Sequence, residues 1–354
     1  MPDVRKLPQL KPMTEKDPEK APVLERICDF LFMGKRGIFF FVAAVLILYL
    51  LFCAAAERAL KNGVYNIMRE IGSNGFGVSY TTALSYRDLT SGLYIDDFVL
   101  TAPEAMGGWT LKTGRLSISA FPFSNKIFLR FDGTHSLTVR NIGDIRLVVG
   151  RGEIVYEKPV GSKPFAVRIS LGGMTAAAPK SMTGFAVPSL DASLAPEGET
   201  AFSFDVKAGN ATLPAYLSQH LPESVEYLLL RGKLTGFSEK REKPLWTDWT
   251  DNGGLVELER GELIWKPFMA QTSGTVAFDA AYKMSAALTA RLYGFFDLLD
   301  ALEAGSYLHG AQVSLAKVVL GENLKKEDGE AIESLTTPVS FQNGLFYAGP
   351  VRIY

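Results

Sequence analysis

GIFFFVAAVLILYLLFCAAA, residues 37–56, is the stretch that decides how the chain is organised. It is twenty residues long and carries no charge, and about 20 such residues are what a helix needs to cross the hydrocarbon core of a bilayer. The stretch has no polar stripe, which a helix on the surface of a globular domain would have. The sequence therefore predicts a transmembrane helix over residues 37–56, with a short head before it and the bulk of the chain after it.

The head, residues 1–36, combines several prolines with charges of both signs and few large apolar residues. This composition is typical of a disordered segment. Lys35 and Arg36 lie directly before the span, and basic residues beside a span favour the cytoplasmic side, although Arg58 and Lys61 follow its other end. We expect a single-pass protein of the cell inner membrane, with its N-terminus in the cytoplasm and the bulk of the chain in the periplasm.

Two processing signals compete with a permanent anchor. The three alanines at residues 54–56 resemble the cleavage site of a signal peptide, but the apolar run is longer than the usual stretch of about 7 to 15 residues. Cys53 resembles a lipoprotein cysteine, but the bulky Phe52 before it does not fit that signal. Cys28 and Cys53 are the two cysteines of the chain, so no disulfide can form in the bulk that follows the span.

The chain beyond the span divides by its hydrophobic pattern. A helical spacing of apolar residues predicts a membrane-proximal amphipathic helix over residues 57–77, and residues 78–213 then alternate apolar and polar side chains between turn residues, as half-buried strands do. Residues 214–252 read as a helical and loop connection, and residues 253–354 as a second β region with two short helices. The predicted fold is mainly β, with antiparallel meander sheets that either close on themselves or curl around an apolar groove.

Local signals sharpen this picture in the second half of the chain. The connection is expected to be helical over residues 214–230 and a charged loop over residues 238–252. Apolar residues at i, i+3, i+4 and i+7 predict a short helix over residues 295–302. Those at i, i+4, i+7 and i+8 predict another over residues 311–319, and a glycine follows each helix. The pair at residues 343–344, Asn-Gly between apolar runs, predicts a two-residue hairpin near the end of the chain.

No recognisable catalytic or metal-binding motif occurs in the sequence. Its three histidines, His135, His220 and His309, are isolated from one another and from cysteine, whereas zinc sites need such ligands at short spacings. The formal net charge of −1 does not indicate a nucleic-acid-binding protein. We therefore predict a protein that is not an enzyme, has no cofactor and no metal, and does not bind nucleic acid.

Apolar side chains on the predicted strands are the more informative feature. A sheet with an apolar face must bury it against helices, against another sheet or against a ligand. Core packing is one explanation, and an open groove of the size of a lipid is the other. The candidate lipid-contact residues are Phe121, Phe123, Ile127, Leu129, Phe131, Phe202 and Phe204. The tryptophans of the charged loop, Trp246 and Trp249, are candidates for contact with a partner, or they cover the edge of the core.

Several segments occur in an order that resembles a known family. The C-terminal half contains paired strands before a W-x-P turn at residues 253–268, SGTVAFD at 273–279, a strand and short helix at 287–302, and TPVSFQNGLFYAGP at 337–350. The N-terminal half adds the strand pair of residues 109–131. Together they resemble a domain-of-unknown-function family of alphaproteobacteria that is similar in style to the AsmA-like envelope proteins. The long proline-rich head departs from the family pattern.

The resemblance implies a function that the residue chemistry alone does not. AsmA-like proteins are single-span inner-membrane proteins whose periplasmic sheets curl around an apolar groove implicated in phospholipid movement or envelope homeostasis. The expectation for this chain is therefore a non-enzymatic periplasmic protein that binds or passes phospholipid. The alternative is a scaffold or assembly subunit of an envelope or secretion complex, which would recruit another envelope protein through a sheet edge or through Trp246 and Trp249.

Overall fold

The computed structural model divides the chain into two units, residues 1–55 and residues 56–354, which we describe separately. The structure describes ten stretches of the chain: residues 35–87, 90–120, 124–140, 143–160, 164–177, 184–213, 220–238, 243–321, 324–325 and 333–353.

Helix α2 (Lys35–Ser73) runs without a break through the predicted span and the predicted membrane-proximal helix. In the first unit most of the apolar side chains described from Val42 onward are exposed, and Leu48 and Leu51 are 69% and 65% accessible. Among the described residues it is the one helix that is long and apolar enough to cross a membrane. Because apolar surface is unfavourable in water by about 25 cal/mol per Å², this exposed segment fits a lipid environment.

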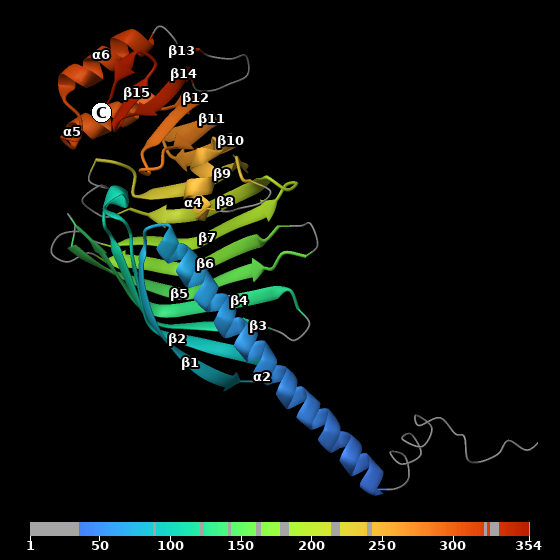
Figure 1. Ribbon diagram of the computed structural model, residues 1–354. Helices are drawn as coiled ribbons and strands as arrows, with labels where there is room; N and C mark the ends of the chain where they lie inside the picture. The colour runs from blue at the N-terminus through green and yellow to red at the C-terminus, as the bar shows by residue number, and fades with distance from the viewer. Residues whose placement is uncertain are drawn as a thin grey trace, which may run out of the picture. The chain divides into compact units, whose positions relative to one another are not determined.

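The second unit is built on one antiparallel sheet in which each long strand pairs with the next along the chain (Figure 1). Its first twelve strands are 10 to 15 residues long. They are β1 (Gly77–Arg87), β2 (Thr90–Thr101), β3 (Thr110–Ala120), β4 (Lys126–Val139), β5 (Gly143–Glu157), β6 (Ala166–Ala177), β7 (Phe185–Pro196), β8 (Ala201–Thr212), β9 (Ser224–Thr235), β10 (Leu255–Trp265), β11 (Phe268–Phe278) and β12 (Met284–Tyr293). The predicted antiparallel meander is thus confirmed, as a single sheet.

Two helices follow β12 and cover the C-terminal end of the sheet (Figure 1). They are α5 (Phe295–Ala304) and α6 (Gly310–Gly321), at the two positions that the apolar spacing predicts. The sheet continues through β14 (Ser334–Gln342), which pairs with β12. The remaining short strands are β13 (Leu324–Lys325), β15 (Leu345–Ala348) and β16 (Val351–Arg352).

The predicted Asn-Gly hairpin joins β14 to β15. Asn343 and Gly344 have φ angles of +53° and +81°. Positive φ at both central residues is the geometry of a type I′ turn, whose twist matches that of the two strands that it connects. This prediction is confirmed.

The two faces of the sheet differ in chemistry. One face is apolar across the strands: Ile154, Ile169, Ala192, Val206 and Leu230 are cross-strand neighbours from β5 to β9. The opposite face carries paired polar side chains, because successive residues of a strand point to opposite faces. Its cross-strand pairs include Arg130 with Glu153, Ser170 with Asp191, and Arg231 with Asp205.

Helices cover the apolar face at both ends of the sheet. The half of α2 in the second unit packs Leu60 and Val64 on a cluster formed by β2 and β3. Within that cluster Leu93 and Ile95 are 1% and 0% exposed. At the other end α5 and α6 pack on β11 to β16, where Leu335 is fully buried. Each end is therefore a two-layer core of helix on sheet.

The structure corrects the predicted connection at residues 214–252. Residues 214–219 lie outside the described residues, but β9 occupies residues that were expected to be helical. Leucine favours helices in isolation, yet this segment forms hydrogen-bonded ladders with both β8 and β10, and tertiary pairing overrides the local preference. In the expected loop, residues 245–251 form a short helix, α4 (Leu245–Asp251).

Helix α4 is fastened to the end of α2. The backbone N–H of Leu245 donates to Glu70 Oε1 at 3.0 Å, and that of Trp246 donates to Asn74 Oδ1 at 2.8 Å. The Tyr282 hydroxyl, in the turn between β11 and β12, donates to the Asn74 carbonyl at 2.6 Å. The first N–H groups of a helix have no partner within it, so these contacts cap α4. These hydrogen bonds hold the C-terminal end of α2 against the second half of the sheet.

Candidate functional site

The candidate site is the apolar face of the five central strands β5 to β9, which we call the open apolar face. Three rows of cross-strand neighbours form it. Their apolar side chains are partly exposed, unlike those of β2 and β3. The rows comprise Ile154, Ile169, Ala192, Val206 and Leu230; then Tyr156, Val167, Leu194 and Phe204; then Leu171, Leu190, Ala208 and Leu228.

The two helix-covered clusters stop short of this face. The cluster under α2 reaches Phe131 on β4, and the cluster under α5 and α6 reaches Leu263 on β10. Within the part of the chain that the structure describes, no residue of β5 to β9 belongs to either cluster. The open apolar face is therefore continuous with two buried cores but shares neither of their helical covers.

The predicted lipid-contact residues fall into three environments. Phe121 and Phe123 lie outside the described residues. Ile127, Leu129 and Phe131 on β4 are partly buried and pack against the cluster under α2. Ile127 and Leu129 pair with Tyr156 and Ile154 of the open apolar face, so these β4 residues lie beside it.

The two phenylalanines predicted on β8 separate. Phe204 is partly exposed on the open apolar face. Phe202 lies two residues away on the same face but is only 4% exposed, because its ring lies 5.0 Å from that of Phe165 and 5.1 Å from that of Phe237. A role in lipid contact stays a prediction for both residues.

Two of the candidate phenylalanines lie over glycines of a neighbouring strand. A Cβ atom at Gly152 would come within 2.6 Å of the Phe131 ring. A Cβ atom at Gly232 would come within 3.0 Å of the Phe204 ring and 2.0 Å of the Glu257 carbonyl oxygen. Because glycine has no side chain, each ring can pack directly on the backbone of the neighbouring strand.

An aromatic row, which the sequence patterns did not indicate, borders the open apolar face. Successive ring centroids are 4.5 to 6.2 Å apart, within the range of favourable aromatic contacts. The row consists of Tyr156, Phe165, Phe202, Phe237, Trp249, Trp246 and Tyr282. Its members come from separate segments of the chain, so no local spacing identifies it.

Both predicted partner-contact residues are members of the aromatic row. Trp249 is 6% exposed and its indole N–H donates to the Thr235 carbonyl at 2.7 Å. Trp246 is partly buried and stacks on Tyr282 at 4.5 Å. This placement agrees with the interpretation that the tryptophans cover the edge of a core. Contact with a partner stays a prediction.

A pair of buried polar residues interrupts the apolar face at β3 and β4. Thr113 and His135 are directly opposed in the ladder, and each is 6% exposed. Neither Thr113 Oγ1 nor His135 Nε2 has a hydrogen-bond partner. Burial lowers the pKa of His135, since a charged imidazole is poorly solvated there, and Asp132 opposes this shift. Burial therefore favours the neutral form of the imidazole.

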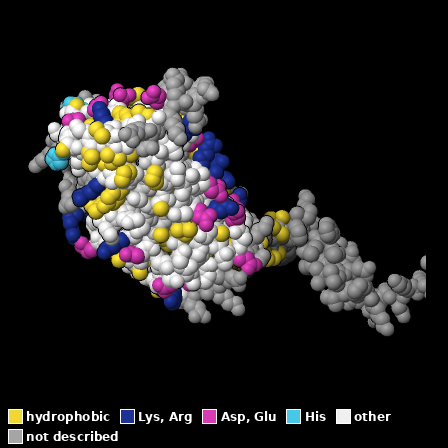
Figure 2. Space-filling model, turned by 90° about the horizontal axis from the view of Figure 1, so that it is seen from above, with side chains coloured by type: hydrophobic (Ala, Val, Ile, Leu, Met, Phe, Trp, Pro, Cys, Tyr) yellow, Lys and Arg dark blue, Asp and Glu magenta, His cyan; other side chains and the backbone are white. Residues whose placement is uncertain are grey.

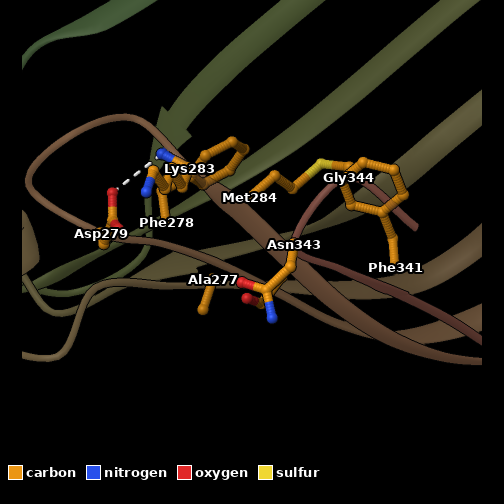
Figure 3. A pocket seen from close by; sticks show the side chains of 9 residues that line it. Ala277, Phe278, Asp279, Lys283, Met284, Phe341, Asn343 and Gly344 are labelled. Atoms are coloured by element: carbon orange, nitrogen blue, oxygen red, sulfur yellow. Dashed lines mark hydrogen bonds between the residues drawn. The ribbon is translucent and has the colours of Figure 1, made fainter. Parts of the chain in front are cut away.

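A pocket of about 550 Å³ lies where β11, β12 and the β14–β15 hairpin meet (Figure 3). Phe278, Met284 and Phe341 supply apolar surface there, and Asp279 accepts a 2.8 Å hydrogen bond from the backbone N–H of Lys283. Apolar side chains beside one acid and one base suit a small amphiphile, and the pocket adjoins Trp246, whose ring lies 5.7 Å from that of Phe278.

Elsewhere the surface is mixed. On the face seen in Figure 2, apolar side chains gather in patches between charged ones. Leu315 and Val318 of α6 are 54% and 73% exposed. Among the described residues, no group of three or more His, Cys, Asp or Glu side chains could hold a metal ion.

A family model described as "Uncharacterized protein conserved in bacteria (DUF2125)" matches residues 90–354. The match begins at β2 and so includes the open apolar face, α4, α5 and α6. No curated protein and no solved structure matches the chain.

Proposed function

Since the chain belongs to the uncharacterised bacterial family DUF2125, whose description assigns no activity, we propose a function from the sheet itself. The protein binds or passes lipid along the open apolar face and does not act as an enzyme. It is held by α2 in the inner membrane, with the bulk of the chain in the periplasm. This proposal agrees with the resemblance to AsmA-like envelope proteins and extends it to this chain.

The observation that carries the proposal is the contrast in cover along one apolar face. A run of half-exposed apolar side chains across five neighbouring strands is unfavourable in water, and a ligand of matching chemistry removes that cost. Each CH₂ group of an acyl chain buried there contributes about 0.8 kcal/mol. The rows of apolar side chains run across five strands, from β5 to β9, and an acyl chain can lie along them. The apolar segment of α2 supports an origin of the lipid in the adjacent membrane.

An edge of the sheet supports a second candidate function, a scaffold or assembly subunit. Among the described residues, strand β1 pairs with β2 alone, and its eleven residues are free of proline and carry a single charge, Arg87. An unprotected edge strand presents N–H and C=O groups that another strand can bind. Leu315 and Val318 on α6 add exposed apolar surface for an envelope partner.

The test is native mass spectrometry of the full chain, purified from a bacterial membrane and ejected from its detergent micelle. We expect phospholipid at a fixed stoichiometry in the wild type. Ile169→Asn places an amide on the open apolar face and should reduce the retained lipid. Arg168→Asn, one residue away, changes an exposed side chain of the opposite face and is the matched control.

Equal retention by Ile169→Asn and the wild type would contradict the proposed site. A wild type that retains no phospholipid would contradict lipid binding altogether. Proteins that copurify at a fixed ratio in that case would favour the scaffold function. Circular dichroism of each variant establishes that the sheet has formed before the retained lipid is compared.

A further inference from the structure

Thr113 and His135 form a buried polar pair on the apolar face of the sheet. They are cross-strand neighbours, and both are more than nine-tenths buried. Buried polar groups are bonded in the large majority of cases, and an unpaired one costs about 1–3 kcal/mol. Two such groups, Thr113 Oγ1 and His135 Nε2, remain unpaired at one position. Two neighbouring buried groups without hydrogen-bond partners point to a ligand atom that could bond to both.

The surroundings of this pair are apolar and adjoin the open apolar face. Strand alternation directs Lys112 and Ser136 to the opposite face, so they do not satisfy the pair. On the next strand His135 faces Leu147 of β5, and the Phe131 ring lies edge to face with the imidazole at 5.9 Å. Strand β5 is also the first strand of the open apolar face. A hydrogen-bonding position thus lies at one margin of an apolar surface.

We propose that Thr113 and His135 form a polar seat for the oxygen-bearing head of the lipid. An ester carbonyl or carboxylate oxygen accepts hydrogen bonds from the Thr113 hydroxyl and the His135 Nε2–H group, and the acyl chain extends over β5 to β9. Phe131, which is partly exposed, lies edge to face with the imidazole and borders the seat. This inference rests on the proposed function and deepens it, because it specifies which end of the lipid is recognised and where.

A neutral imidazole is suited to this role. It donates one hydrogen bond without bringing a charge into an apolar surface, and the threonine hydroxyl rotates to donate the second. A bare hydrocarbon chain would leave both groups unpaired. The seat therefore selects lipids with an oxygen acceptor at the end of the chain, whether a diacyl phospholipid or a free fatty acid.

The experiment compares isosteric variants of the full chain in nanodiscs. Thr113→Val and His135→Leu remove the hydrogen-bonding atoms, and His135→Gln keeps an N–H group close to the position of Nε2. The probes are dimyristoyl phosphatidylethanolamine and palmitic acid, offered separately and counted by native mass spectrometry. We expect retention to fall about 10-fold in the first two variants, as the loss of one or two hydrogen bonds predicts. His135→Gln should restore most of it. The probe that is retained identifies the source of the head group.

Two further measurements separate a ligand seat from a structural role. If the groups are unpaired without lipid, Thr113→Val will leave the unfolding temperature unchanged or raise it; a decrease would indicate a buried water as the partner and overturn the seat. With ¹⁵N-labelled histidine, addition of the retained probe should shift the imidazole signals of His135 and leave those of His220 and His309 unchanged. Unchanged His135 signals would overturn the proposal.

The inference and the proposed function fail in different ways. If the wild type retains lipid and Thr113→Val and His135→Leu retain it equally, lipid binding stands and the seat is wrong. If the wild type retains neither probe, both proposals are wrong.

Discussion

The ends and the middle of the sheet follow the same apolar and polar alternation but reach different degrees of burial. Ile95 on β2 is fully buried beneath α2, whereas Ile169 on β6 occupies an equivalent inward position and stays partly exposed. The difference comes from the two helix-covered clusters, which among the described residues contain strands at the two ends of the sheet and none from β5 to β9. Alternation therefore identifies which face of a strand is apolar. Whether that face is buried depends on the elements elsewhere in the chain that pack on it.

Truncation of equivalent isoleucines should give the largest effect. Ile95→Ala opens a cavity in a closed core and should lower the free energy of unfolding by about 2–5 kcal/mol. Ile169→Ala removes a side chain that already contacts solvent and should cost less than about 1.5 kcal/mol. Denaturant titration of the full chain in detergent measures both. Equal losses would mean that β6 is as well covered as β2.

Addition of a methyl group at Gly232 should have the next largest effect. Its Cβ would come within 2.0 Å of the Glu257 carbonyl oxygen, and overpacking of this kind costs about 1–3 kcal/mol. Gly172→Ala on β6 is the control, because its nearest neighbour would be Arg151 Cβ at 3.9 Å. Thermal unfolding compares the two variants. A Gly232→Ala protein as stable as Gly172→Ala would mean that Phe204 and the β9–β10 backbone are not as close as described.

Loss of the cap on α4 should have a smaller effect. Asn74→Ala removes the acceptor for the Trp246 N–H, and the loss of a capping side chain costs about 1 kcal/mol. Hydrogen exchange should become faster in α4 and remain unchanged in β6. Ser73→Ala is the matched control, because its exposed hydroxyl bonds only to the Glu70 carbonyl. Slow exchange in α4 of the Asn74→Ala protein would show that other contacts hold this helix.

The smallest effect concerns pH. Burial lowers the pKa of His135 in the folded chain, so the unfolded chain binds a proton more readily below about pH 6.5. Stability from this group is therefore complete above that pH and declines as the pH falls toward the folded pKa. His135→Leu should flatten this decline, and His309→Leu, which removes an exposed imidazole, is the control. A His135→Leu protein with the wild-type pH dependence would contradict the effect.

Much of the fold could be predicted because its determinants are local. Alternation between turns identified strands, and the Asn-Gly pair fixed the last hairpin. The prediction of a helix around Leu229 was wrong, because three consecutive leucines fit both the helical and the strand period. The hydrogen-bonded ladders with β8 and β10 make this segment a strand. Helix α4 was missed because its capping partners, Glu70 and Asn74, lie more than 170 residues earlier in the chain.

The candidate site was less predictable than the fold. Phe202 and Phe204 have the same side-chain direction in the sequence pattern, and only the rings of Phe165 and Phe237 make one buried and the other partly exposed. His135 had the appearance of an isolated histidine. His135 becomes a candidate because it lies opposite Thr113 on the neighbouring strand. This pairing depends on a register shift between β3 and β4, which the alternation of side chains does not reveal.

The order in which this chain folds follows from its strand pairing. From β1 to β12 every strand pairs with its neighbour in sequence, so a chain that emerges from a ribosome or a translocation channel can add one strand at a time without waiting for a distant segment. The fastening of α2 is the exception, because Asn74 bonds to Trp246 and Tyr282, which lie 172 and 208 residues later. The contact with Tyr282 can form only after the β11–β12 turn has been made, so it forms once most of the second half of the sheet is present.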